Sequence, residues 1–211
     1  MPNITVHHLN NSKSQRILWV LEELGLDYNI KYYQRQPTMA APPEMRQVHP
    51  LGKSPITEID GRVMAESGAV VGFLIDRFGN GRFAPARDSD DWGHYIEMLH
   101  YPEGSANTPF FLNLIVNAMQ LGESPLKDYA DEQTKLHLDY MQGLVGENEY
   151  LVGNAFSGAD IQIGFTLQGA NVGGLLAGRQ NLIDYVARLE ARPAYQAAIE
   201  KGGAMNLDFG G

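Results

Sequence analysis

The sequence predicts an α/β domain followed by an all-helical domain. Hydrophobic residues near the N-terminus alternate with a period of two, then adopt helical spacing, and alternate again around residue 30. The Asp60-Gly61 pair between two short strand-like runs indicates a β-hairpin. Beyond residue 85 the apolar residues recur at helical spacing, and no strand pattern follows. The sheet is therefore expected in the first part of the chain.

The first domain is predicted to have a βαβ unit followed by a ββα unit. A segment rich in proline and turn formers, residues 35–50, connects the two units and holds at most a short helix. The expected elements are strand 4–9, helix 14–24 with Gly25 as its stop, strand 28–32, hairpin strands 56–59 and 62–65, and a helix ending near Phe78.

We place the domain boundary near residue 85, which gives domains 1–82 and 88–211. Pro102 and Pro109 are expected to distort or interrupt one helix of the second domain, because proline lacks the N–H that a helix interior needs. The helices expected there are 92–99, 112–121, 126–145, 160–177 and 182–189.

The segment 51–56, with the sequence LGKSPI, has the pattern of a ligand-binding turn. Pro55 cannot donate a hydrogen bond to a sheet, so it suits the start of a strand or a turn, with a cis bond as one option. This position leaves the backbone of Ser54 free to pair with a ligand. At the end of the hairpin, Glu66 and Ser67 combine a carboxylate, a hydroxyl and the free amides of a helix N-terminus. Such a junction can bind both the ammonium and the carboxylate of an amino-acid terminus.

These two motifs resemble the glutathione-binding half of the cytosolic glutathione transferases, a thioredoxin-like domain with a Gly-Lys-x-Pro turn and a Glu-Ser pair. Residues 9–19, LNNSKSQRILW, are similar to the strand-to-helix turn of the serine-type, theta/phi-like transferases, where a serine four residues before an arginine meets the thiol. Ser12 and Arg16 have that spacing. Segment 153–160 is similar to a capping segment of the family's helical domain, and HYPEGS at 100–105 to a motif of some bacterial and fungal members.

The resemblance implies the glutathione transferase fold: an N-terminal thioredoxin-like α/β domain and a C-terminal all-α domain. It implies glutathione as co-substrate, a small hydrophobic electrophile as second substrate, a homodimer and a role in detoxification. By the same resemblance, Ser12 is the catalytic residue that polarises the thiol. Lys53 pairs the glycyl carboxylate, Ser54 acts through its backbone, and Glu66 with Ser67 holds the other end of the tripeptide.

Several of these residues have a simpler structural interpretation. Ser12 with Gln15 fits a helix capping box, and Ser14 or Asn11 could contact the thiol in place of Ser12. Lys53 could be a solvated lysine. Glu66 could do no more than stabilise the N-terminus of a helix through the helix macrodipole.

A capping pair lies in the second domain. Ser157 and Asp160 fit a capping box, with a staple between Phe156 and Ile161, and we expect them to support folding rather than catalysis.

Composition excludes several functions. A net charge of -9 and a pI near 5.1 argue against nucleic acid or an anionic membrane as partner. The chain has no cysteine, so any thiol in the reaction belongs to the substrate.

His7 and His8 must face opposite sides of their strand, and no pair of histidines has zinc-ligand spacing, so no metal is expected. Without a signal peptide or an apolar run of membrane-spanning length, the expected location is the cytoplasm.

Two other functions remain open at this point. One is a related glutathione-dependent enzyme, such as an ether-cleaving lyase, a peroxidase or an isomerase, which uses the same thiolate on a different partner. The other is a non-catalytic interaction module that uses this fold as a scaffold, because fold alone does not establish activity.

Overall fold

The computed structural model describes residues 1–206, which divide into two compact units. The first contains residues 1–84 together with 189–206, and the second contains residues 85–188. The first holds the sheet and the second is helical, as the predicted fold class requires. The predicted domains, 1–82 and 88–211, stay a prediction. The compact units differ from them because the segment from residue 189 packs with the first unit.

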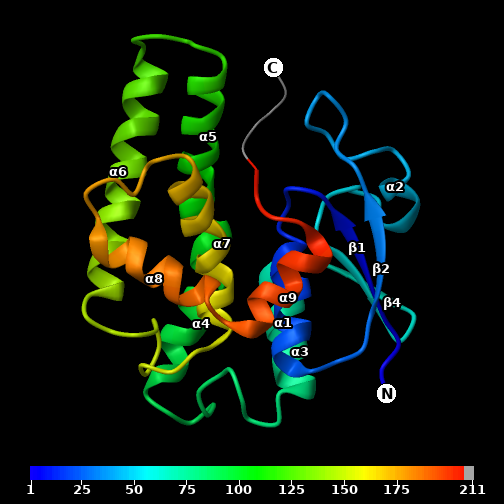
Figure 1. Ribbon diagram of the computed structural model, residues 1–211. Coiled ribbons are helices and arrows are strands. Elements are labelled where there is room, and N and C mark those ends of the chain that lie inside the picture. Colours follow the sequence, from blue (N-terminus) through cyan, green and yellow to red (C-terminus); the bar gives the residue numbers. More distant parts are fainter. Residues whose placement is uncertain (207–211) are drawn as a thin grey trace. The chain divides into compact units, whose positions relative to one another are not determined.

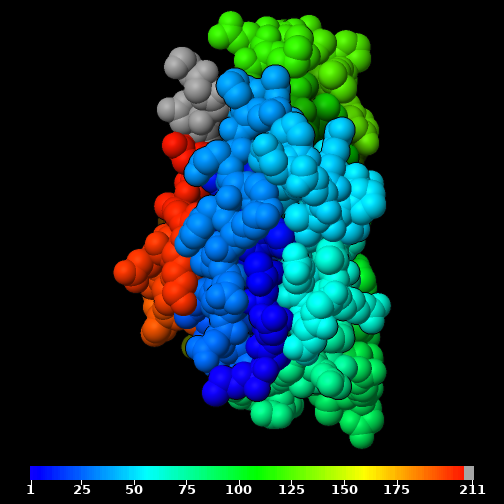
Figure 2. Space-filling view, turned by 90° about the vertical axis from the view of Figure 1, so that its right-hand side faces the viewer, coloured from blue at the N-terminus to red at the C-terminus, as the bar shows by residue number. Residues whose placement is uncertain are grey.

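The first unit is built on a four-stranded mixed sheet. Its strand order is β2-β1-β3-β4, with β1 and β2 parallel and the other neighbours antiparallel. In Figure 2, the dark-blue first strand runs between the light-blue second strand and the cyan hairpin. The strands are β1 (Ile4–Leu9), β2 (Asn29–Tyr33), β3 (Ile56–Ile59) and β4 (Arg62–Ala65).

The predicted hairpin turn is present at Asp60 and Gly61. Both residues have positive φ, 50° and 81°, and Ile59 pairs with Arg62 across the turn. Two successive residues with positive φ define the turn whose twist suits a two-residue hairpin, which is why Asp-Gly is favoured there. The hairpin brings the end of β4 back to the level at which β3 begins.

Helices cover both faces of this sheet (Figure 1). α1 (Gln15–Leu24), α3 (Ser67–Phe78) and α9 (Pro193–Gly202) lie on one face, and the short α2 (Met45–Val48) lies on the other. α1 packs against both α3 and α9. It ends where predicted, at Gly25, which adopts a left-handed conformation with φ 66°.

α9 was not predicted from the sequence. It begins with proline at a first-turn position, where a missing N–H costs no hydrogen bond. Its Tyr195 stands edge-on to Trp19 of α1, with ring centroids 5.1 Å apart.

His7 and His8 point to opposite faces of β1, as predicted from the strand period. His7 Nδ1 lies 2.9 Å from the Tyr33 hydroxyl, and its Nε2 lies 2.7 Å from Glu58. His8 instead contacts α1 and the end of α9, through Ser14 and Gly202. The two imidazoles therefore serve separate networks.

The second unit is helical throughout its regular structure. Its described elements are α4 (Asp91–Tyr101), the π-helix η1 (Pro102–Ala106), α5 (Asn107–Ala118), α6 (Pro125–Val145), α7 (Gly158–Val172) and α8 (Gln180–Glu190), which ends at the border between the units. In the part of the chain from residue 1 to 206, no helix combines the length and apolarity needed to span a membrane.

Pro102 distorts the helix, as expected, without breaking it. Because its nitrogen carries no hydrogen, the regular bonding pattern cannot continue, and a π-helical turn joins α4 to α5. Pro109 falls in the first turn of α5, where its missing N–H is tolerated. α5 therefore includes Pro109 and begins at Asn107, five residues before the predicted start at residue 112.

Asp160 joins three segments of the second unit. The predicted capping box is confirmed: the Ser157 backbone N–H donates to the Asp160 carboxylate at 2.8 Å, and the Ser157 hydroxyl accepts from the helix. The carboxylate also accepts from the Leu151 N–H at 3.0 Å and from the Tyr185 hydroxyl at 2.6 Å. Ser157 and Asp160 thus have the structural role that was expected.

Candidate functional site

The Ser12 hydroxyl lies in the turn between β1 and α1 and is 5% exposed. Its oxygen is 2.6 Å from the Ser54 hydroxyl, 2.8 Å from the Ser14 hydroxyl and 2.7 Å from the Leu9 carbonyl, to which it donates. The structure therefore brings together two of the predicted site residues, Ser12 and Ser54, which are 42 positions apart. Sequence reasoning assigned Ser54 a backbone role only and missed its hydroxyl.

The capping box predicted as the alternative for Ser12 is not formed. The N-cap of α1 is Ser14, and it makes no side-chain cap bond. Ser14 is fully buried, and its hydroxyl lies 2.9 Å from His8 Nδ1. Burial is the larger influence on His8 and lowers the pKa of its imidazole, while the bond to the Gly202 carbonyl opposes this shift.

Arg35 fixes the conformation of this turn. Its guanidinium donates to the backbone carbonyls of Asn10 at 3.1 Å, Asn11 at 2.9 Å and Met39 at 2.7 Å. Asn11 has φ 50°, and its side-chain oxygen accepts from the Asn206 N–H at 2.9 Å. Burial lowers the pKa of Arg35. Sequence reasoning missed Arg35, because nothing local marks a guanidinium that binds backbone 24 residues away.

The turn before β3 has the geometry expected from its proline. The Ser54-Pro55 bond is cis, and Gly52 has φ 55°. A Cβ at Gly52 would lie 2.6 Å from the Arg46 side chain, so glycine allows the turn to pass close to α2. Lys53 is exposed beside it.

Glu66 and Ser67 form the junction between β4 and α3. Glu66 is exposed, with φ 69° and ψ 113°, a conformation that costs energy in a residue with a side chain and is found at ligand sites. Neither Glu66 nor Lys53 uses its charged side chain in a hydrogen bond or ion pair with another residue of segment 1–206. Glu66 makes no cap bond to α3, so the helix amides are not covered by its carboxylate.

Ser67 has a partner that the sequence analysis did not identify. Its hydroxyl is 1% exposed and accepts from Arg16 Nη1 at 2.9 Å. Arg16, itself 1% exposed, thus carries a buried positive charge to the N-terminus of α3. From the sequence, Arg16 was expected only to mark the spacing to Ser12.

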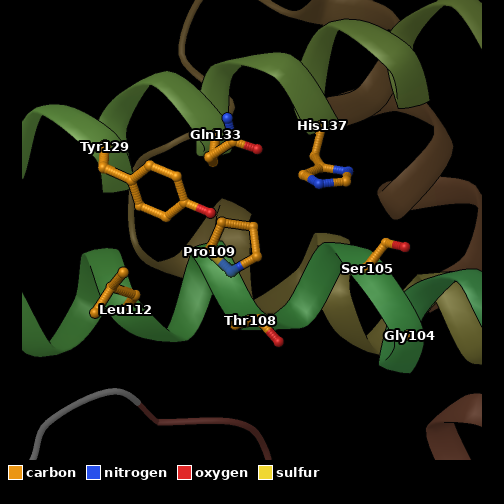
Figure 3. Close-up of a pocket in the computed structure, with 8 residues that line it drawn as sticks. All are labelled: Gly104, Ser105, Thr108, Pro109, Leu112, Tyr129, Gln133 and His137. Atoms are coloured by element: carbon orange, nitrogen blue, oxygen red, sulfur yellow. The ribbon is translucent and has the colours of Figure 1, made fainter. Parts of the chain in front are cut away.

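The HYPEGS segment contributes to a separate pocket inside the second unit. The pocket has a volume of about 220 Å³ between η1–α5 and α6, with Tyr129, Gln133 and His137 along one wall (Figure 3). His137 Nδ1 lies 2.7 Å from the Tyr101 hydroxyl, and burial raises the pKa of Tyr101 and lowers that of His137. Its other lining residues are Gly104, Ser105, Thr108, Pro109 and Leu112.

No group of three or more His, Cys, Asp or Glu side chains within residues 1–206 is arranged to hold a metal ion.

Comparisons with known proteins identify the family of the chain. A family model described as "Glutathione S-transferase, N-terminal domain" matches residues 12–77, and one described as "Glutathione S-transferase, C-terminal domain" matches residues 108–193. The first matched range contains all five predicted site residues. The chain belongs to the glutathione S-transferase family, so it is a glutathione transferase that uses glutathione as co-substrate.

Among its relatives, the chain is 34% identical to "Glutathione S-transferase 3" of Schizosaccharomyces pombe, over 94% of this chain and 87% of that protein. It is 29% identical to "Glutathione S-transferase 1" of Saccharomyces cerevisiae, over 99% of both chains. A crystal structure of a glutathione S-transferase from Actinobacillus pleuropneumoniae is 34% identical and has a TM-score of 0.85, covering 97% of this chain and 95% of that one.

Proposed function

We propose that the enzyme is a serine-type, theta/phi-like glutathione transferase in which Ser12 contacts the substrate thiol. The observation that carries this assignment is the 2.6 Å contact between the hydroxyls of Ser12 and Ser54. This contact joins the turn between β1 and α1 to the turn that contains the Ser54-Pro55 bond. Ser14 is fully buried behind Ser12 and bonded to His8, which makes Ser12 the outer of the two serines. Asn11 stays the alternative, because its side-chain oxygen accepts from the Asn206 N–H while its amide N–H groups can still donate.

The remaining predicted residues would hold the ends of glutathione. Lys53, exposed beside the proline turn, pairs the glycyl carboxylate, and the Ser54 backbone faces the cysteinyl part. The Glu66 carboxylate takes the ammonium of the γ-glutamyl end. Ser67 and the amides at the start of α3 take its carboxylate, with the buried Arg16 guanidinium adding positive charge behind Ser67.

Catalysis then depends on stabilising the thiolate. A thiol with a pKa of ~8.5 is only a few per cent ionised near neutrality. A hydroxyl that donates to sulfur favours the anion, and lowering the pKa by ~2 units corresponds to ~2.7 kcal/mol. The thiolate attacks a small hydrophobic electrophile, forming a carbon–sulfur bond, and either expels a leaving group or leaves a carbanion that takes a proton. We place this detoxification chemistry in the cytoplasm.

The glutathione site is tested by the double substitution Glu66→Ala with Ser67→Ala. Because two charge-assisted contacts to the γ-glutamyl end are removed, we expect glutathione affinity to fall by about 10- to 100-fold in calorimetric titration. Glu44→Ala is a matched control, because Glu44 is likewise an exposed N-cap glutamate of the first unit without a side-chain cap bond. Equal affinity in the double variant and the control variant rejects the assignment of the site.

We also propose that the enzyme is a homodimer that uses α5 and α6 of the second unit. Apolar and aromatic side chains are unusually exposed there, at 64% for Phe111, 55% for Tyr129 and 56% for Leu136. Such a surface is typical of a subunit interface. Leu136→Glu should produce a monomer in analytical sedimentation, whereas Val172→Glu, an exposed apolar position on α7, should not. A dimer of unchanged affinity in Leu136→Glu contradicts this interface.

A further inference from the structure

The Ser54 hydroxyl is a polar group of the candidate site that has no role in the function proposed so far. Its oxygen lies 2.6 Å from the Ser12 oxygen, and this contact is its one hydrogen bond within residues 1–206. Ser54 is partly exposed, whereas Ser12 is only 5% exposed. The Ser54 hydroxyl is therefore the more accessible of the two to a ligand.

The proton of the Ser54 hydroxyl has a defined direction in the free site. A hydroxyl has one proton to donate and two lone pairs that accept. Ser12 donates its proton to the Leu9 carbonyl at 2.7 Å. At the 2.6 Å contact Ser12 is therefore the acceptor and Ser54 is the donor. The Ser54 proton is thus held only by the neutral oxygen of Ser12.

The backbone of Ser54 is also available to a ligand. Its N–H and its carbonyl make no hydrogen bond to any other group of the described chain, residues 1 to 206. Backbone groups in folded proteins are normally paired with protein or with water. Ser54 thus presents a backbone donor, a backbone acceptor and a hydroxyl in the turn before β3, which supports ligand contact by the whole residue.

Ser14 is not an equivalent donor. It is fully buried, and its hydroxyl lies 2.9 Å from His8 Nδ1. A carbonyl only accepts hydrogen bonds, so His8 Nε2 donates to the Gly202 carbonyl at 2.8 Å and Nδ1 is left as an acceptor. Ser14 therefore donates its proton to His8, in the interior of the first unit.

We propose that Ser54 is a second catalytic residue whose hydroxyl donates a hydrogen bond to the sulfur of glutathione. This inference rests on the proposed function, in which Ser12 contacts that sulfur. Because the two hydroxyl oxygens are 2.6 Å apart, a sulfur atom in contact with Ser12 lies beside Ser54 as well. Ser54 then meets the cysteinyl part of glutathione through its backbone and the sulfur through its side chain.

The donation requires only a rotation of the Ser54 hydroxyl. When the thiol ionises, its S–H bond breaks and the proton passes to solvent. The Ser54 O–H bond stays intact and turns from the Ser12 oxygen to the thiolate. It exchanges a neutral acceptor for an anion, and hydrogen bonds to an ionised group are about twice as strong. Because this gain exists only for the thiolate, it lowers the pKa of the thiol.

The matched pair Ser54→Thr and Ser54→Val tests the hydroxyl, because the two side chains have nearly the same shape and only threonine keeps an O–H group. The measurement is ultraviolet titration of the enzyme–glutathione complex. We expect the midpoint for thiolate formation to lie about one pH unit higher in Ser54→Val than in Ser54→Thr. Equal midpoints in these two variants overturn the proposal.

Two further variants support this comparison. Ser54→Ala removes the hydroxyl without adding a methyl group, and its midpoint should rise as in Ser54→Val. Ser89→Ala, in a turn of the second unit, should titrate as the wild type. A wild-type midpoint in Ser54→Ala also overturns the proposal.

S-methylglutathione separates an effect on the sulfur from an effect on the rest of the tripeptide. It has the same backbone as glutathione, but its sulfur has no proton to lose. Its affinity in calorimetric titration should be equal in Ser54→Thr and Ser54→Val. If it binds about ten-fold more weakly to Ser54→Val, the hydroxyl holds the tripeptide rather than the thiolate, and the proposal is rejected.

The same pair in a Ser12→Ala background shows whether Ser54 contacts the sulfur or acts only through Ser12. With direct donation, the midpoint should be higher with Ser54→Val than with Ser54→Thr by about half a pH unit or more, because burial disfavours an anion that has lost both donors. Equal midpoints in this background show that Ser54 only orients Ser12, and they overturn direct donation.

Ser12→Ala alone separates this inference from the function on which it rests. If Ser12→Ala titrates as the wild type while Ser54→Val does not, the proposed contact of Ser12 is wrong and Ser54 is the donor to sulfur. If the midpoint rises in Ser12→Ala while Ser54→Thr and Ser54→Val titrate alike, Ser12 keeps its role and only the donation by Ser54 is excluded.

Discussion

Ser12→Ala is expected to lower kcat/KM for glutathione conjugation near pH 7 by roughly 10- to 150-fold. A hydrogen bond to a charged group contributes ~1.5 to 3 kcal/mol, and in this account the bond to sulfur is made by the thiolate. Glutathione affinity should change little, because Lys53, Glu66 and Ser67 still hold the ends of the tripeptide. The loss should therefore appear in the reaction rate rather than in binding.

The expected loss of activity in Ser12→Ala depends on pH. The thiolate is present above the thiol pKa, so a raised pKa costs most activity at low pH and little once the pH exceeds the ordinary value of ~8.5. Conjugation kinetics across that range, with Ser89→Ala as a control in an exposed turn of the second unit, measure the effect. Unchanged kcat/KM at pH 7 in Ser12→Ala contradicts the assignment.

Asp160→Ala is expected to destabilise the second unit by about 3–5 kcal/mol, because it removes the shared acceptor of several buried donors. The carboxylate is fully buried and accepts from two backbone N–H groups and from the Ser157 and Tyr185 hydroxyls. Burial raises the pKa of this carboxyl, and the four hydrogen bonds oppose that shift. Without the carboxylate, the Leu151 segment, the start of α7 and the middle of α8 lose their common partner.

Chemical denaturation monitored by circular dichroism measures this loss of stability. Ser157→Ala, which removes the cap hydroxyl and leaves the carboxylate, should cost only ~1 kcal/mol. If Asp160→Ala costs no more than Ser157→Ala, the carboxylate is not the centre of this network.

Local signals in the sequence were enough to predict most of the first unit and the start of α7 in the second. Gly25 ends α1, the Asp60-Gly61 turn forms the hairpin, and Ser157 with Asp160 caps α7, because each feature depends on residues a few positions apart. The π-helix after α4 was anticipated only as a distortion at Pro102, since sequence spacing does not determine how the freed hydrogen bonds rearrange.

Short sequence motifs predicted only part of the candidate site. The positions of Ser12, Lys53 and Glu66 could be proposed from short motifs, whose residues are neighbours in the chain. The contacts that orient the site join residues far apart, such as Arg16 with Ser67, 51 positions away, and His8 with Gly202, 194 positions away. Those contacts follow from the packing of α1 against α3 and α9, which sequence spacing alone does not reveal.

The most direct test of this account is the ultraviolet absorbance of the enzyme–glutathione complex as a function of pH, for wild-type enzyme and Ser12→Ala. The account predicts thiolate absorbance in the wild-type complex at pH 7. In Ser12→Ala the absorbance should appear only as the pH approaches ~8.5, the ordinary pKa of a thiol. Identical curves for the two proteins would show that Ser12 does not stabilise the thiolate.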